Sequence, residues 1–189
     1  MWLYLATGFT GGLTLVFLIR WVVRLLEAHL TVDAYYSPKG GCTEAVVREI
    51  HKARKEVLVQ AYSFTSKPIA GALIEAKGRG AHVEILLDKS NEKETFTELE
   101  HLIKEGLIPQ IDAHHAIAHN KIMIIDKRTL ITGSFNFTHQ AEVENAENLL
   151  IIKGKPELVN TYRQQFLAHK SHCQAPGTKV ETFQHRKAA

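Results

Sequence analysis

The sequence predicts an α/β domain built on a mixed, mostly parallel β-sheet with helices on both faces, preceded by an N-terminal transmembrane helix. Strand-like apolar runs alternate with segments of helical periodicity between residues 32 and 170. The last strand-like runs follow one another closely, so that part of the sheet is expected to be antiparallel. Residues 2–19 form an uncharged apolar run. We therefore divide the chain into an anchor at 1–27, a folded domain at 32–170 and a disordered polar tail at 171–189.

The N-terminal run is long enough to cross a bilayer, because about 20 residues at about 1.5 Å per residue span a hydrocarbon core of roughly 30 Å. A cleaved signal peptide and a buried core helix are the alternatives. No basic residue precedes the run and no small-residue cleavage site follows it, which favours an uncleaved anchor. Gly8, Gly11 and Gly12 argue against a helix buried in a soluble core. Because Arg20 and Arg24 follow the run, positive-inside bias predicts that the rest of the chain is cytoplasmic.

Strand and helix patterns alternate regularly in the first half of the domain. Ser66 is expected to cap the second helix, with Pro68 in its first turn and Gly78 and Gly80 at its end. The predicted elements are a strand at 32–37, a helix at 43–54, a strand at 56–64, a helix at 67–78, a strand at 82–88, a helix at 95–104 and a short strand at 107–112.

The second half begins with two strands, at 121–126 and 129–134, joined by a turn that contains Lys127 and Arg128. One more strand at 147–152 and a final helix at 156–170 complete the domain. The polar, aperiodic residues 171–189 are expected to be disordered.

Composition describes a globular protein and limits its partners. The net charge is +3, but residues 27–152 hold 14 basic and 18 acidic residues. The body of the chain is therefore not a basic nucleic-acid clamp, and any affinity for phosphate must come from local residues, the basic tail or protonated histidines. The two cysteines, Cys42 and Cys173, are too few for a disulfide framework or a zinc ribbon.

The segment 119–136 contains the residues that suggest chemistry. His119, Lys121 and Asp126 stand at HxKxxxxD spacing, and Gly133, Ser134 and Asn136 follow in a Gly-Ser-x-Asn turn. On a strand, residues two apart point to the same face, so His119 and Lys121 lie together. A nucleophile beside a cation forms a plausible site for a phosphate ester.

With these motifs the sequence resembles the phospholipase D superfamily. It is most similar to the members with one copy of the motif, such as the bacterial endonucleases of the Nuc type and the mitochondrial cardiolipin hydrolases of the Zucchini type. The resemblance covers about residues 33–170 and includes YSPKGG, AYSFTS, AKGRGAHVEILLDKSN, HNKIMIID, TGSFNFT and ENAENLLII. It implies a phospholipase D-like fold and a catalytic domain at 32–170.

The resemblance implies a role for each motif residue. His119 is expected to attack phosphorus and form a phosphohistidine, since a neutral imidazole is a competent nucleophile. Lys121, Ser134 and Asn136 are expected to bind the phosphate oxygens. Glu147 matches the acid that bonds the other imidazole nitrogen and orients the ring. No metal and no cofactor is required.

Two residues of the motif are expected to be structural. Asp126 is predicted to brace the turn or a neighbouring backbone group, and Gly133 to avoid crowding the phosphate or to supply a positive φ. A second histidine must protonate the leaving oxygen, and a single motif cannot supply it. In the single-motif members two subunits share one active site, so a homodimer is expected, with His119 of a second copy as the proton donor.

Other readings of individual residues stay open. His114 and His115, with His119, form a possible zinc loop, although no carboxylate or cysteine completes the set. His139 touches substrate or is a solvated residue at a helix start, and the second is favoured. Phe135 and Phe137 more often indicate core packing than base stacking, and Lys127 and Arg128 are most simply an exposed turn.

The sequence therefore favours a membrane-anchored, metal-independent phosphodiesterase that acts on nucleic acid as an endonuclease. A phospholipase D or cardiolipin hydrolase acting on membrane phospholipids is the alternative, and a non-catalytic phosphate-binding module is the second one. Family analogy places the catalytic domain outside the cytoplasm, whereas positive-inside bias places it inside.

Overall fold

The computed structural model describes residues 16–22, 30–94 and 97–177. Strand and helix alternate first, and strands dominate the later part of the chain. The elements are β1 (Thr31–Tyr36), α2 (Cys42–His51), β2 (Glu56–Ala61), α3 (Lys67–Gly78), β3 (His82–Asp88), the 3-10 turn η1 (Lys89–Glu92), α4 (Leu99–Lys104), β4 (Gln110–Asp112), β5 (Lys121–Ile125), β6 (Thr129–Gly133), α5 (His139–Val143), β7 (Asn148–Lys153) and α6 (Pro156–Lys170).

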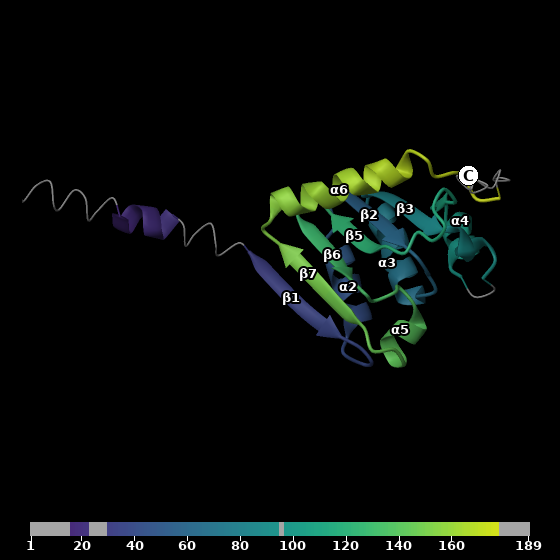
Figure 1. Ribbon diagram of the computed structural model, residues 1–189, viewed down its shortest axis with the longest axis horizontal. Helices are drawn as coiled ribbons and strands as arrows, with labels where there is room; N and C mark the ends of the chain where they lie inside the picture. Colours follow the sequence, from purple (N-terminus) through teal and green to yellow (C-terminus); the bar gives the residue numbers. More distant parts are fainter. Residues whose placement is uncertain (1–15, 23–29, 95–96, 178–189) are drawn as a thin grey trace, which may run out of the picture.

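Within the described residues the strands form one sheet in the order β1-β7-β6-β5-β2-β3-β4 (Figure 1). The sheet is mixed, as predicted, but the prediction of a mostly parallel sheet is wrong. Only β2–β3 and β3–β4 are parallel, and the other four neighbouring pairs are antiparallel. The connections between β5, β6 and β7 are too short to return the chain to the opposite end of the sheet, since the turn after β5 holds a few residues and α5 has only five, so these strands pair as antiparallel neighbours.

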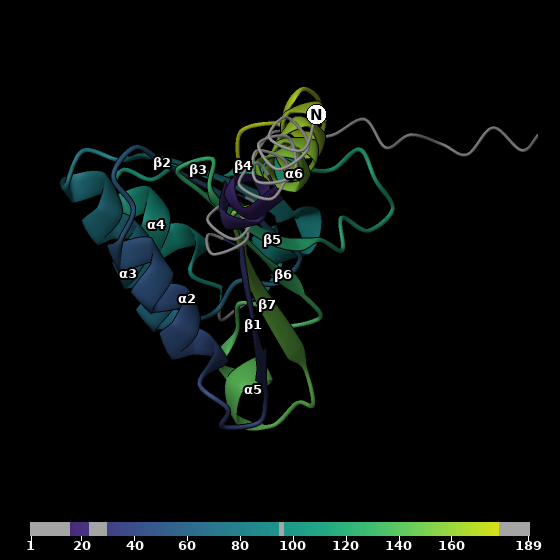
Figure 2. The ribbon, with the colours of Figure 1, turned by 90° about the vertical axis from the view of Figure 1, so that its left-hand side faces the viewer.

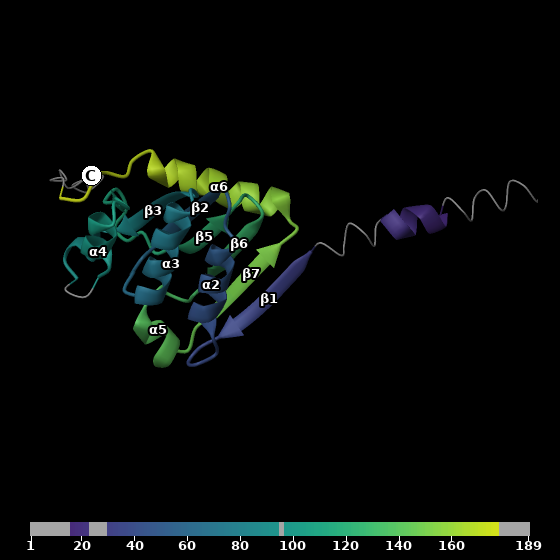
Figure 3. The ribbon, with the colours of Figure 1, turned by 180° about the vertical axis from the view of Figure 1, so that it is seen from behind.

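Helices cover both faces of the sheet, which confirms the predicted layers. Figure 2 shows α2 and α3 on one side and α6 on the other, and Figure 3 shows the face that α2 and α3 cover. Successive side chains along a strand point to opposite layers. In β2, Val57 and Val59 pack in the core under α2 and α3, whereas Leu58 packs in the core under α6. Strands buried on both faces read as continuous apolar runs, which is why 56–61 and 121–125 resemble each other in sequence.

Element boundaries differ from the predictions where a residue interrupts regular hydrogen bonding. Strand β4 begins at Gln110, not at 107, because Pro109 has no N–H to donate to a neighbouring strand. Ser66 stands directly before α3, but its side chain makes no capping hydrogen bond, and its carbonyl accepts from Ala70 N. Helix α4 begins at Leu99, and the predicted start at 95 lies outside the described residues.

Most of the predicted anchor at 1–27 lies outside the described residues. The part of it that the structure describes, residues 16–22, is helical and exposed. Among the residues that the structure does describe, there is no helix with the length and apolar character needed to span a bilayer. At the other end, Gln174 pairs with Ile111, so the ordered chain continues past α6 to residue 177. Residues 178–189 of the predicted tail lie outside the described residues.

Candidate active site

Three antiparallel neighbours bring the motif residues to one edge of the sheet. Strand β6 ends where β5 and β7 begin, since each runs opposite to the next. His119 precedes β5, Ser134 and Asn136 follow β6, and Glu147 precedes β7. This is the edge beside α5 in Figure 1. The antiparallel strand order therefore brings residues up to 28 positions apart in the sequence to the same end of the sheet.

The His119 side chain is exposed at this edge and packs against Tyr62. The two ring centroids are 4.6 Å apart, with the rings tilted by 56°. Lys121 Nζ donates a 2.9 Å hydrogen bond to the His119 carbonyl oxygen and lies 5.1 Å from the centroid of the Tyr62 ring. Tyr62 therefore supports both the nucleophile and the cation from one side.

Lys121 is a buried cation, with only 7% of its surface exposed. Burial lowers the pKa of its ammonium group, and the carboxylate of Glu147 partly opposes that effect by raising the pKa. A desolvated ammonium that lacks a close counter-charge gains more from an incoming anion than a solvated one does. The arrangement suits a phosphate oxygen next to Lys121.

Ser134 and Asn136 occupy the loop that leaves β6. Ser134 Oγ accepts from Asn148 N at 3.0 Å and from Asn148 Nδ2 at 3.3 Å, which leaves its hydroxyl hydrogen for another acceptor. Asn136 Oδ1 is buried and has no hydrogen-bond partner among the described residues. The side-chain amide therefore has a polar atom that no protein group satisfies among the described residues.

Glu147 is held in place by its neighbours. Its Oε1 accepts from Asn145 Nδ2 at 3.2 Å, and Ser37 Oγ accepts from its backbone N–H at the same distance. Its negative charge raises the pKa of Lys121 and also contributes to the raised pKa of the Cys42 thiol. The bond from Glu147 to an imidazole, which the resemblance implies, stays a prediction.

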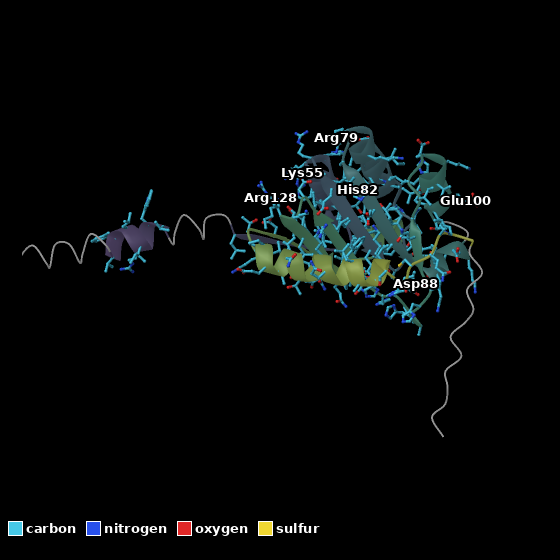
Figure 4. The ribbon with its side chains drawn as sticks, turned by 90° about the horizontal axis from the view of Figure 1, so that it is seen from above. Lys55, Arg79, His82, Asp88, Glu100 and Arg128 are labelled. Atoms are coloured by element: carbon cyan, nitrogen blue, oxygen red, sulfur yellow. The ribbon has the colours of Figure 1, made fainter. Side chains whose placement is uncertain are left out.

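Asp126 makes the contacts of a residue that braces the backbone. Its carboxylate accepts from the N–H groups of Arg54, Lys55 and Glu56 at 2.9, 2.7 and 3.0 Å. Burial would raise the pKa of this carboxyl group, but the three backbone donors outweigh it and hold the pKa below its ordinary value. Figure 4 shows Lys55 and Arg128 at the opposite end of the sheet from Asp88. Asp126 belongs to the former end, far from His119.

Gly133 is required by the neighbouring strand. Its φ is +149°, and a β-carbon there would lie 2.3 Å from the carbonyl oxygen of Asn148. The positive φ predicted for this position is confirmed, and β7 is near enough to exclude every larger side chain, whereas crowding of a phosphate stays a prediction.

The remaining residues considered from the sequence have simple roles. Phe135 and Phe137 are fully buried in the core, and Lys127 and Arg128 are exposed in the turn between β5 and β6. His139 is exposed at the first residue of α5.

A cavity of ≈ 670 Å³ opens near α5, and its lining contains none of the motif residues. It is bounded by the loop after β1 and by the starts of α3 and α5, with Lys39, Lys67 and His139 among its side chains. The exposed edge at His119, not this cavity, holds the groups that can react with a phosphate ester.

Sequence reasoning missed one cluster of side chains. Asp112, His115, His169 and His172 come together near the C-terminal end of α6. The zinc loop considered from the sequence, and not favoured there, grouped His114 and His115 with His119 instead. The sequence contains two pairs of potential ligands three residues apart, Asp112–His115 and His169–His172. Only the fold brings the two pairs together.

Comparisons with known proteins agree with this fold. Residues 46–170 match the family described as "Cardiolipin synthase, PLD-like domain". Phospholipase D of Rickettsia conorii is 44% identical over 140 residues, which are 74% of this chain and 70% of the relative. Mitochondrial cardiolipin hydrolase of Danio rerio is 29% identical over 123 residues, which are 65% of this chain and 54% of that protein.

A solved structure supports the same assignment. The crystal structure of the phospholipase D family member Nuc from Salmonella typhimurium superposes with a TM-score of 0.74 and 31% identity, over 77% of this chain and 97% of Nuc. Together with the single HxKxxxxD motif at the sheet edge, these matches show that the chain belongs to the phospholipase D superfamily, in its single-motif group, and is a phosphodiesterase of that superfamily.

Proposed function

We propose that this protein is a metal-independent endonuclease, which cleaves nucleic-acid phosphodiester bonds through a phosphohistidine in an active site shared by two copies of the chain. The observation that supports it best is the set of His119, Lys121, Ser134, Asn136 and Glu147 at one open edge of the sheet.

The proposed reaction has two displacements at phosphorus. A neutral His119 nitrogen forms a bond to phosphorus as the bond to the leaving oxygen breaks, and that oxygen takes a proton from a second, protonated histidine. Water then attacks phosphorus, gives a proton to the same second histidine, and releases His119. Lys121 and Asn136 offset the charge that gathers on the non-bridging oxygens, and Ser134 donates one more hydrogen bond.

A second copy of the chain is needed to supply the second histidine. His119 is exposed in the single chain, and the motif occurs once in the sequence. A two-fold axis beside His119 places the His119 side chains of two copies in one site. In that site Glu147 orients an imidazole, which is the role its position at the edge allows.

Nucleic acid is the proposed substrate because the site is an exposed edge, not a deep pocket for an acyl chain, and because Nuc aligns over 97% of its length. A phospholipid is the second candidate. It is favoured by relatives named phospholipase D at 41–44% identity and by the apolar run at residues 2–19.

The apolar run at residues 2–19 is proposed to anchor the protein in a membrane, with the catalytic domain on the cytoplasmic side by positive-inside bias. Protease accessibility in intact cells tests the orientation, because an exported domain is digested and a cytoplasmic one is protected.

The substrate experiment uses the full chain in detergent and in vesicles, with single-stranded DNA, RNA, duplex DNA, phosphatidylcholine and cardiolipin as separate substrates. A chelator is present, and circular dichroism verifies that the fold is retained. His119→Ala is expected to abolish turnover, whereas His139→Ala, the matched change of another exposed histidine at this edge, keeps it. Turnover by His119→Ala excludes the histidine mechanism. Turnover of lipid alone excludes the endonuclease function. If the folded wild-type chain binds phosphate esters but turns none of them over, the protein is the non-catalytic phosphate-binding module.

A further inference from the structure

A second cluster of reactive side chains lies outside the motif. Asp112 ends β4, His115 lies in the loop that follows, His169 is in the last turn of α6, and His172 comes just after that helix. Each residue offers one ligand atom, and these four atoms all lie within 4.8 Å of one another. Residues 57 and 60 positions apart therefore meet at one point.

The distances within the cluster suit a small cation. Asp112 Oδ2 lies 2.7 Å from His169 Nδ1, 3.1 Å from His115 Nδ1 and 3.4 Å from His172 Nε2. Ligand atoms at 2.0–2.1 Å from a tetrahedral Zn²⁺ ion are about 3.3 Å apart. The separations from Asp112 lie on both sides of that value, and all four ligand atoms lie within 4.8 Å of one another, so the side chains would have to draw together to enclose an ion.

We propose that Asp112, His115, His169 and His172 bind a structural Zn²⁺ ion, which ties the end of β4 and the loop before His119 to the end of α6. Imidazole nitrogen and carboxylate oxygen are both zinc ligands, and four of them would fill a tetrahedral shell without an open position. The ion is proposed to stabilise the fold and to take no part in the reaction at His119.

The Asp112 carboxylate is buried and is oriented by hydrogen bonds from neighbouring backbone groups. Its side chain is 1% exposed, and its Oδ1 accepts from the backbone N–H groups of His114 and His115 at 3.2 and 3.4 Å. Such outer contacts fix the direction of a ligating carboxylate.

A metal-free cluster is the competing reading, in which three imidazoles donate to one carboxylate. All three nitrogens approach Asp112 Oδ2, and the ring centroids of His115, His169 and His172 are 4.7, 5.0 and 5.4 Å apart. Neutral imidazoles can each donate one N–H, but Asp112 Oδ2 has about two lone-pair sites for these three nitrogens. A cation between the same nitrogens and the carboxylate would instead give each ligand atom its own bond.

The proposed ion would act on the segment that leads to the nucleophile. The loop at 113–118 is also held by Lys89 Nζ, which donates to the His115 carbonyl at 2.9 Å, and by Asp88, which accepts from Ala118 N at 2.7 Å. His115 stands four residues before His119. Metal at His115 would therefore anchor the start of this loop, while Asp88 holds its end.

The test measures zinc directly on the purified full chain. Elemental analysis is expected to find about one Zn²⁺ per chain, and Co²⁺ added to the chelated protein is expected to give the strong visible absorption of a four-coordinate ion. Zn²⁺ added back to the chelated chain is expected to raise its melting temperature. His172→Gln and His115→Gln are each expected to weaken Zn²⁺ binding by at least about 100-fold, since even outer contacts of a metal site contribute 10–100-fold.

Matched controls are His51→Gln and His139→Gln, which change exposed histidines outside the cluster and are expected to bind Zn²⁺ as the wild type does. The proposal is overturned if the chelated wild type gives no four-coordinate Co²⁺ spectrum and no rise in melting temperature with Zn²⁺. It is also overturned if either cluster variant binds as tightly as the controls. The Co²⁺ measurement on the wild type decides the matter even where a variant fails to fold, and none of these readouts depends on the proposed nuclease activity.

Discussion

Replacing Asp126 with Asn tests whether the aspartate of the motif stabilises the fold or reacts with substrate. Asp126 Oδ1 accepts from the N–H groups of Lys55 and Glu56, and Oδ2 accepts from that of Arg54. Asn tolerates the positive φ of 52° at this position, so the turn itself is preserved. The substitution keeps one acceptor oxygen and removes the charge.

The expected loss follows from these three contacts. The bond to Arg54 N is lost, and the bonds to Lys55 N and Glu56 N change from charged to neutral. A hydrogen bond to a charged group contributes about 1.5–3 kcal/mol and a neutral one about 1 kcal/mol, and two of these donors are solvent-exposed, so the free energy of unfolding should fall by about 1–2 kcal/mol. For a chain of this size that is a fall in melting temperature of about 2–8 °C. Asp126→Ala removes every acceptor and adds strain at the positive φ, so its loss should be larger.

The effect should depend on pH in a defined direction. Because the folded-state pKa of Asp126 is lowered, its contribution is complete above the unfolded value of about 3.9 and is lost as pH falls through the folded value. The stability difference between wild type and Asp126→Asn should therefore be constant near neutral pH and shrink below about pH 4.

The assay is urea unfolding from neutral to acid pH, with turnover measured per folded molecule at neutral pH. Asp33→Asn, an exposed aspartate on the edge strand β1, is the matched control and should leave stability unchanged within about 0.5 kcal/mol. An Asp126→Asn protein of wild-type stability that has lost its turnover would refute the structural reading of this residue.

Three further predictions concern the edge that contains His119. Gly133→Ala should lower stability by about 2 kcal/mol or more in thermal melts because its β-carbon meets the Asn148 carbonyl, whereas Gly71→Ala in α3, with open space around it, should be neutral or stabilising. Lys121→Met should reduce turnover by about 10²–10³-fold without lowering the melting temperature, since it removes a buried charge but keeps its volume; a large fall in stability would contradict that. Co-expression of equal amounts of wild type and His119→Ala should leave about a quarter of the activity if two histidines share one site, and about a half if each chain acts alone.

Much of the fold was predictable because its central strands are buried on both faces. Continuous apolar runs such as 56–61 and 121–125 predict strands regardless of which neighbours they pair with. Their direction was harder to predict. The short turn at Asp126 fixes β5 and β6 as antiparallel, but no residue near β1 in the sequence shows that β1 pairs antiparallel with β7 as the outermost strand of the sheet. Strand order depends on contacts between distant segments, which a single sequence does not contain.

The candidate site was predictable to the extent that it is local in sequence. His119 to Asn136 spans one hairpin, and the resemblance supplied Glu147 just before the next strand. The Asp112 cluster was not found because its two halves are separated by β5, β6 and β7. Each half is an ordinary three-residue spacing, and only the packing of α6 against β4 shows that they belong together.

The position of Asp126 explains how a residue far from the reaction can belong to its motif. Five residues of extended chain at about 3.3 Å per residue separate Lys121 from Asp126 by about 17 Å, so the aspartate cannot reach a phosphate held by Lys121. Asp126 instead binds the start of β2, while Lys121 lies opposite Ala61 at the end of β2. A slip of one residue between β5 and β2 would turn Lys121 to the other face of the sheet. By holding the register at one end of the strand pair, Asp126 determines which face presents the cation at the other end.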